Sequence, residues 1–163
     1  MTRHIRFIPA IAGAAAALVA SACRTSPAGA QTPVQWKVAP AAAAPAGGVT
    51  HVRLIATMDP GWHIYAITQP PGGPVATRIT LPQGQPFTLA GPIRVAPPPS
   101  TALDESFGIQ VQMHEGKAEF LVPVKRSGTA PASTVRVDAR YQACSESLCL
   151  PPQTAHLSIP VAR

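Results

Sequence analysis

The dominant pattern along the chain is an alternation of apolar and polar residues with a period of two. In the stretch VTHVRLIATM, for example, Val52 and Leu54 fall on one face and Arg53 falls on the other. The same period recurs in six stretches, at residues 49–58, 76–81, 108–116, 117–126, 133–142 and 154–163. Such alternation, rich in β-branched residues and interrupted by Pro and Gly, predicts β-strands. No stretch carries a 3.6-residue apolar stripe with capping residues, so we expect no helix.

Several short strands in a chain of this length indicate an all-β fold, most simply an immunoglobulin-like antiparallel β-sandwich. The 20 prolines agree with this fold class, because proline is tolerated at strand ends and in loops but not in helix interiors. One connection, residues 91–108, interrupts the strand pattern with a triple proline and an acidic-aromatic tip. Connections of this length are often functional; the alternative is a surface excursion stiffened by proline.

The first thirty residues have the features of an export signal. Arg3 and Arg6 precede the apolar run IPAIAGAAAALVASA, which is shorter than the roughly 20 apolar residues of a membrane-spanning helix. The small residues 28–30 favour cleavage before Gln31. The alternative is a lipoprotein signal ending before Cys23, although Ala20 stands where such signals normally have Leu. In both cases Cys23 is unavailable as a partner for the other cysteines.

The rest of the chain predicts one exported domain. Residues 31–48 are expected to form a flexible N-terminal arm, and residues 49–163 the β-sandwich. A span of this size is sufficient for one domain with one core. No other stretch is apolar for long enough to cross a membrane, so we expect a soluble periplasmic or exported protein, tethered to a membrane only if Cys23 is lipidated. Export also permits disulfides.

The positive charge of the chain does not point to nucleic acid. The formal net charge is +6, with 13 Lys and Arg against seven Asp and Glu. Three of the basic residues precede Gln31, which lowers the net charge of the remainder to +3. The remaining basic residues are scattered, without runs or interleaved aromatic residues. Nucleic-acid binding therefore has little support.

The segment YQACSESLCLPP carries the candidate chemistry, since Cys144 and Cys149 lie between the last two predicted strands. As a structural disulfide the pair would stabilise little, because closing a loop this small contributes about 2 kcal/mol against about 4.7 kcal/mol for a hundred-residue loop. As a redox pair it would be local and accessible. It lacks the helix N-terminus that lowers the thiol pKa in thioredoxin-type motifs, so any tuning must come from neighbours such as Tyr141 and Glu146.

A metal site is the third interpretation of the segment. No zinc-type spacing of cysteines and histidines is present. A soft copper site remains an alternative, drawing on Met58, Met113, His51, His63, His114 and His156.

Three motifs stand out along the chain: YQACSESLCLPPQT, PGWHIYAITQPPGGP and the segment DESFG at 104–108. Together they resemble the N-terminal exported domain of DsbD, a transmembrane thiol:disulfide reductase, and the resemblance covers the chain from about Val34 to Val161. It implies an immunoglobulin-like sandwich whose cysteine pair exchanges electrons through thiol-disulfide chemistry. It implies no cofactor and no metal ion.

The resemblance also implies roles for individual residues. Cys149 matches the cysteine that forms the mixed disulfide with a partner, and Cys144 matches the one that resolves it. Tyr65 matches a tyrosine lining the pair, and Asp104 and Glu105 match acidic residues near it. The cap phenylalanine of the family is replaced by Ser106, and Phe107 follows one position later, which leaves the shielding of the sulfurs open.

The partners follow from the same resemblance. We expect a protein-disulfide reductase component that is reduced by a thioredoxin-like donor domain or a membrane electron carrier. Its acceptors would be exported thioredoxin-fold oxidoreductases, including those of cytochrome c maturation. The chain has no transmembrane segments or C-terminal thioredoxin-like domain like those of DsbD, so the donor is expected to be a separate protein. The alternatives are a non-catalytic binding domain with a structural loop disulfide and an exported copper-handling domain.

Overall fold

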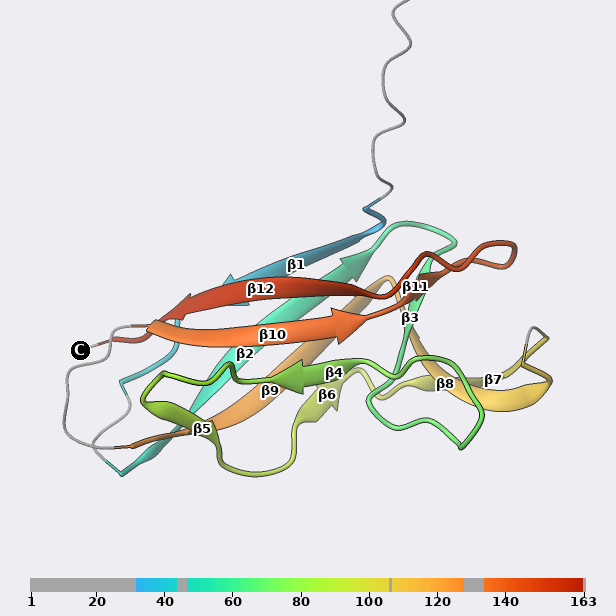
Figure 1. Ribbon diagram of the computed structural model, residues 1–163. Helices are drawn as coiled ribbons and strands as arrows, with labels where there is room; N and C mark the ends of the chain where they lie inside the picture. Colours follow the sequence, from blue (N-terminus) through green and yellow to red (C-terminus); the bar gives the residue numbers. More distant parts are fainter. Residues whose placement is uncertain (1–31, 44–46, 106, 128–133, 163) are drawn as a thin grey trace, which may run out of the picture. The chain divides into compact units, whose positions relative to one another are not determined.

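The computed structural model describes residues 32–43, 47–105, 107–127 and 134–162, all within one compact unit, Gln31–Arg163. The predicted export signal, Cys23 and Ser106 lie outside the described residues. The described part of the chain forms twelve β-strands and no helix, which confirms the all-β fold class (Figure 1). It accordingly contains no helix that is long and apolar enough to cross a membrane.

Two sheets form the body of an immunoglobulin-like sandwich (Figure 1). One has the order β1-β2-β9-β5, with β6 also paired to β9. Its strands are β1 (Val34–Ala39), β2 (Val49–Met58), β5 (Phe87–Leu89), β6 (Arg94–Ala96) and β9 (Lys117–Arg126). The other sheet has the order β12-β10-β4, and its strands are β4 (Arg78–Thr80), β10 (Thr134–Tyr141) and β12 (Gln153–Pro160).

The alternating sequence places the core between these sheets. Every second residue of β2, from Thr50 to Met58, is buried, while His51 and Arg53 are exposed. In β10 the same period buries Val135, Val137 and Ala139. The buried apolar side chains of both strands belong to one cluster together with Phe120 of β9. The period of two therefore gives each sheet one face in the core and one face in solvent.

A third sheet extends the sandwich at one end (Figure 1). Its order is β11-β3-β8-β7, formed by β3 (His63–Tyr65), β7 (Ser100–Asp104), β8 (Ile109–Glu115) and β11 (Ala143–Cys144). A second, smaller apolar cluster lies on it, composed of Tyr65, Val111, Met113 and Cys144. This sheet carries the cysteine pair away from the main core.

Each of the six stretches predicted as strands overlaps one strand of the structure, and these strands are β2, β4, β8, β9, β10 and β12. The flexible arm is wrong for residues 34–39, which form β1 and pair with β2 along their whole length. Val34 is buried and Trp36 packs against the core. The alternation of VQWKVA is too short and too polar to stand out, and its pairing to β2 stabilises it as a strand.

The interruption of the strand pattern predicted at 91–108 is also wrong. It contains β6, paired with β9, and β7, paired with β8. Strand β6 has only three residues, and Ser100 to Leu103 of β7 are all exposed. Neither strand shows the buried alternate face that a sequence pattern can reveal. The predicted acidic-aromatic tip is the turn of the β7–β8 hairpin.

Candidate functional site: the cysteine groove

Cys144 and Cys149 form a disulfide, with their Cα atoms 4.1 Å apart. The two cysteines differ sharply in their surroundings. Cys144 ends β11 and is 1% exposed, whereas Cys149 lies on the following loop and is exposed. Of the two cysteines, Cys149 is therefore the one that a molecule approaching this end of the domain can contact.

The loop between the cysteines is held by its own hydrogen bonds. The backbone N–H of Ser145 donates to the carbonyl of Leu148 at 2.8 Å, and the N–H of Leu148 donates to Oγ of Ser145 at 3.2 Å. Beyond the loop, the N–H of Leu150 donates to the carbonyl of Ala143 at 2.9 Å. The shape of the loop therefore does not depend on the sulfur–sulfur bond alone.

The register of the third sheet decides which side chains lie near Cys144. Cys144 is directly opposite His63, and His63 is directly opposite Glu115. Tyr65, two residues after His63, is opposite Met113. Residues directly opposite in neighbouring strands project from the same face of a sheet, as do residues two apart within a strand. Both cross-strand rows therefore project from one face, called here the cysteine face.

Tyr65 connects the cysteine face to the β7–β8 hairpin. Its hydroxyl donates a 2.7 Å hydrogen bond to Oδ2 of Asp104. Burial, this hydrogen bond and the negative charge of Asp104 all raise the pKa of Tyr65, in that order of size. The phenol therefore stays protonated and remains a donor. The hairpin is attached to the cysteine face through a bond that an ionised carboxylate strengthens.

Phe107 lies at the tip of that hairpin, against Tyr65. The two rings meet edge to face, with centroids 6.4 Å apart and planes at 87°. The turn is closed by the N–H of Gly108, which donates to the carbonyl of Asp104 at 2.7 Å. Gly108 has a φ of 66°, a conformation that favours glycine. The aromatic ring at the tip thus packs onto Tyr65, itself a member of the cluster around Cys144.

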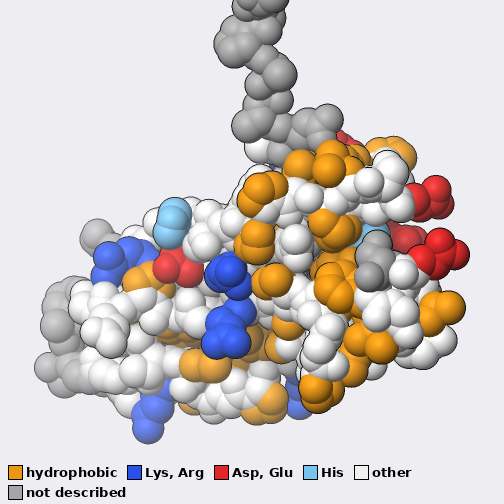
Figure 2. Space-filling model, turned by 45° about the vertical axis from the view of Figure 1, so that its right-hand side comes forward, with side chains coloured by type: hydrophobic (Ala, Val, Ile, Leu, Met, Phe, Trp, Pro, Cys, Tyr) orange, Lys and Arg blue, Asp and Glu red, His pale blue; other side chains and the backbone are white. Residues whose placement is uncertain are grey.

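A groove of about 1050 Å³ opens on the cysteine face. It is lined by parts of β3, β7 and β8, by the turn before β3, and by the loop carrying Cys149. Five of the seven acidic residues of the chain line it. They are Asp59, Asp104, Glu105, Glu115 and Glu146, and the described lining contains neither Lys nor Arg. Figure 2 shows Asp and Glu side chains gathered at one end of the molecule and most Lys and Arg side chains away from it.

His63 is a site residue that the sequence connected with the cysteines only as a candidate copper ligand. Its ring meets Tyr65 edge to face, with centroids 5.1 Å apart. Its Nε2 atom is buried without a hydrogen-bond partner among the described residues. Burial lowers the pKa of His63, with Glu115 and Asp104 acting in the opposite direction. The period of two in His63-Ile64-Tyr65 was the signal that could have placed it beside Tyr65.

Tyr141, by contrast, is not brought to the groove. It ends β10 in the main core, with its ring 5.5 Å from that of Trp36. Its hydroxyl donates to Oε1 of Gln153 at 3.2 Å, and burial raises its pKa. The described lining of the groove does not include it. Its local effect is on the packing of the sandwich beneath the cysteine loop.

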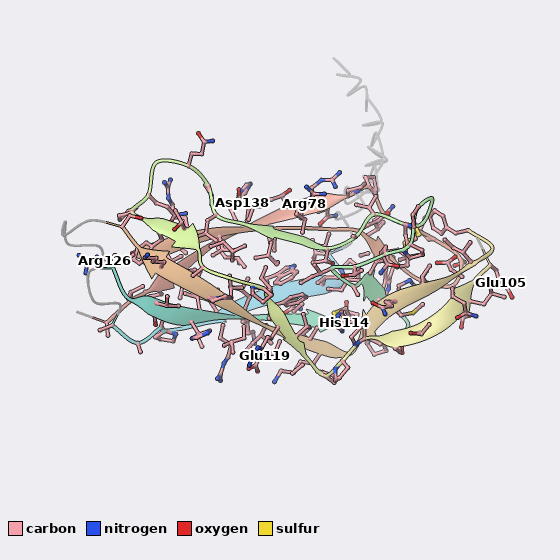
Figure 3. All side chains as sticks on the ribbon, turned by 90° about the horizontal axis from the view of Figure 1, so that it is seen from below. Arg78, Glu105, His114, Glu119, Arg126 and Asp138 are labelled. Atoms are coloured by element: carbon pink, nitrogen blue, oxygen red, sulfur yellow. A yellow bond between two sulfur atoms is a disulfide. The ribbon has the colours of Figure 1, made fainter. Side chains whose placement is uncertain are left out.

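The candidate copper ligands are dispersed. Met58, His63 and Met113 line the groove, but His51 and His156 are exposed on β2 and β12. His114 is buried on the opposite face, 6.0 Å from the ring of Phe120. In Figure 3, His114 lies inward among the strands and Glu105 at the outer end of the hairpin. The described residues contain no group of three or more His, Cys, Asp or Glu arranged to hold a metal ion.

A β-sandwich with a local disulfide, one cysteine of which is exposed and lines a groove, is the arrangement of a thiol-disulfide exchange domain. The family comparison agrees with this class. The sequence model of "Thiol:disulfide interchange protein DsbD, N-terminal" matches residues 30–160. The chain belongs to this family.

One solved structure shows the same fold. The N-terminal periplasmic domain of ScsB from Proteus mirabilis aligns with a TM-score of 0.55 at 20% identity, covering 79% of this chain. The present chain spans 47% of that ScsB chain. The reduced N-terminal domain of DsbD from Neisseria meningitidis aligns with a TM-score of 0.49 at 18% identity, over 76% of this chain and 83% of that one. A search of curated proteins found no match.

Proposed function

We propose that this domain passes electron pairs to oxidised partner proteins through Cys144 and Cys149. The observation that carries the proposal is the difference in exposure between the two cysteines. Cys149 is exposed beside the groove, whereas Cys144 is 1% exposed beneath it. A partner disulfide has access to Cys149 while Cys144 is protected until the mixed disulfide has formed. This asymmetry suits one attacking and one resolving cysteine.

The chemistry proceeds in two exchanges. In the reduced domain the Cys149 thiolate attacks one sulfur of the partner disulfide, and the other partner sulfur leaves as a thiolate that takes up a proton. The Cys144 thiolate then attacks Cys149, breaks the mixed disulfide and releases the second partner thiol. The partner gains two electrons and two protons, and the domain ends with the Cys144–Cys149 bond. Each step needs a thiolate as nucleophile.

The proposed partners are thioredoxin-fold proteins. A thioredoxin-like domain or a membrane electron carrier would restore the reduced state, and exported oxidoreductases, including those of cytochrome c maturation, would receive the electrons. Membership of the DsbD N-terminal family supports this direction of transfer. The periplasmic location of the ScsB domain supports the periplasm as the compartment, reached through the predicted export signal at residues 1–30.

The β7–β8 hairpin would act as a cap over the pair. Asp104 and Glu105 line the groove together with Cys149, and nearby negative charge disfavours a thiolate. The tip carries Phe107, which packs on Tyr65. A partner that pushes the tip aside would remove both charge and ring from the pair. Small oxidants and reductants, which would not displace the tip, would find the acidic side chains and the Phe107 ring still beside the cysteines.

A redox titration of the folded protein tests the proposal. An exchange pair should equilibrate with glutathione or dithiothreitol buffers, whereas a structural disulfide has a potential below about −300 mV and resists the glutathione pool. If the pair stays oxidised in the native fold under reducing buffers, the exchange function is wrong. The alternative of a binding domain with a structural loop disulfide would then stand.

A further inference from the structure

Resolution of the mixed disulfide requires Cys144 to lose a proton in an apolar place. Cys144 is packed in a cluster with Tyr65, Val111 and Met113. Apolar surroundings disfavour a charged thiolate relative to a protonated thiol. The thiolate, however, is the nucleophile that must attack Cys149. A neighbouring proton acceptor would therefore speed resolution.

His63 is placed to be that acceptor. It is directly opposite Cys144 in the β3–β11 pair, so that the Cβ atoms of the two residues are about 4.5–5.5 Å apart. His63 also lines the groove that Cys149 lines. Its Nε2 atom is buried and, among the described residues, has no hydrogen-bond partner. A buried imidazole nitrogen without a partner is costly to retain for packing alone.

The other polar groups around His63 are less suited to accept this proton. Tyr65 cannot, because burial and Asp104 raise its pKa and keep it protonated. Asp104 already accepts the Tyr65 hydroxyl. Glu115 of β8 is opposite His63 on the side away from Cys144. The ordinary pKa of an imidazole, about 6.5, is also higher than that of a carboxylate, about 4.

The charged groups that face His63 come from every surrounding element of the groove. They are Glu115 of β8, Asp104 and Glu105 at the end of β7, Asp59 of the turn before β3, and Glu146 of the cysteine loop. The negative charges of Glu115 and Asp104 favour protonation of His63, and burial opposes it more strongly. The imidazole is therefore neutral near pH 7 and ready to take a proton. The surrounding carboxylates would stabilise the imidazolium once it forms.

We propose that Nε2 of His63 accepts the proton of the Cys144 thiol as Cys144 displaces a partner from Cys149. The inference rests on the exchange function proposed above. The Cys144 S–H bond breaks, and its electron pair forms the bond to Cys149. The bond between Cys149 and the partner sulfur breaks, and the partner leaves as a thiolate. The proton on His63 then passes to that thiolate or to water, which returns the imidazole to its neutral form.

The reaction of the reduced protein with dithiobis(nitrobenzoic acid) separates the two steps. Attack by Cys149 releases one coloured nitrothiobenzoate, and resolution by Cys144 releases a second. Stopped-flow absorbance gives a rate for each release. The variants are His63→Gln and, as the matched control, His51→Gln at an exposed position of β2. Urea unfolding of each oxidised variant checks that the fold is kept.

In His63→Gln we expect the second release to slow about tenfold or more near pH 7. The first release should change less than about twofold, since Cys149 lies in the exposed loop. The slowing should diminish as the solution approaches the ordinary thiol pKa of about 8.5. His51→Gln should behave as the wild type. Equal second-release rates in His63→Gln and wild type at every pH would overturn the role of His63.

The pH profile of the wild type provides a second readout that needs no variant. With an internal acceptor, the second release should be nearly independent of pH around neutrality. It should fall only in acid, where His63 becomes protonated. A tenfold loss per pH unit from the thiol pKa downward would instead mean that solvent deprotonates Cys144, and would overturn the proposal. A wild type that releases no second nitrothiobenzoate at all would contradict the exchange function itself.

Discussion

The hydroxyl of Tyr65 and the Oδ2 atom of Asp104 are 2.7 Å apart and join β3 to β7 across the intervening strand β8. The Tyr65 ring also supports Phe107 on one side and belongs to the cluster of Cys144 on the other. A single side chain thus connects the tip of the hairpin with the buried cysteine. Substitutions of Tyr65 should therefore affect both the tip of the hairpin and the surroundings of Cys144.

Removing the hydroxyl in Tyr65→Phe should loosen the hairpin from the cysteine face. We expect a loss of stability of about 1 kcal/mol and faster reduction of the disulfide by dithiothreitol. Urea unfolding and reduction kinetics provide the two measurements. The matched control is Tyr141→Phe, which loses its hydrogen bond to Gln153 in the main core. The prediction is contradicted if both variants change the reduction rate equally.

Phe107→Ala should expose the pair without greatly affecting the fold. The ring is 40% exposed, and an aromatic pair of this kind contributes about 0.5–1.5 kcal/mol. We expect a small fall in the urea midpoint and a rise in the reduction rate by small thiols. Leu103→Ala, at a residue of β7 that is 59% exposed, is a control for an apolar loss elsewhere in the same hairpin. An unchanged reduction rate in Phe107→Ala would show that the ring does not shield the disulfide from small thiols.

Single-cysteine variants should differ in their ability to trap partners. Cys144→Ser leaves the exposed Cys149 and should accumulate a mixed disulfide with a thioredoxin-fold protein supplied in oxidised form. Cys149→Ser leaves only Cys144, a residue that is 1% exposed in the disulfide-bonded protein. This variant should form at least about tenfold less mixed disulfide in the same time. Non-reducing electrophoresis and mass spectrometry measure the adducts. Preferential trapping through Cys144 would reverse the assigned roles.

The acidic lining of the groove should favour cationic disulfides. Reduced protein should react faster with cystamine than with the neutral hydroxyethyl disulfide, and added salt should narrow the difference, because screening weakens attraction at the surface. Glu105→Gln and Glu146→Gln should each also reduce the difference in rate between cystamine and hydroxyethyl disulfide. Glu119→Gln, whose residue pairs with Arg53 outside the groove, is the matched control. Identical rates with both disulfides at low salt would contradict the prediction.

His114 should make the domain less stable in acid. Burial lowers its pKa in the folded protein, so the unfolded chain binds the proton more readily. Stability is then fully present above the ordinary histidine pKa of about 6.5 and falls as the pH drops below it. In His114→Leu, the midpoint of urea unfolding should depend less on pH between about pH 7 and pH 5 than it does in the wild type. An unaltered pH dependence would exclude His114, and the exposed His51→Leu is the control.

The strands of the sandwich could be predicted because each has one buried face. In β2 and β10 the period of two in the sequence is the same period that the burial follows. The missed strands had no such signal. Strands β3, β5 and β6 have three residues each, and β7 has an exposed body whose pairing to β8 fixes it. Their existence depends on the neighbouring strand rather than on their own composition.

The site was only partly predictable for a related reason. Tyr65, Asp104 and Phe107 were found through motifs, and the structure brings them together. His63 was not assigned to the cysteines, because its position beside Cys144 depends on the pairing of β3 with β11, which no local pattern specifies. Tyr141 was expected near the pair because it is close in sequence. Tyr141 is instead the last residue of β10, and its side chain is buried in the main core.

The self-bonded loop between Ser145 and Leu148 has a consequence for the speed of the proposed exchange. Its backbone hydrogen bonds, and the one from Leu150 to Ala143 beyond it, do not involve sulfur. Opening the disulfide therefore requires little rearrangement of the surrounding chain, and closing it again requires little search. In the proposed exchange, the oxidised and reduced forms would then have nearly the same backbone and one common docking surface. A donor and an acceptor would use that surface in turn, and release after each exchange would be governed by the sulfur chemistry rather than by refolding.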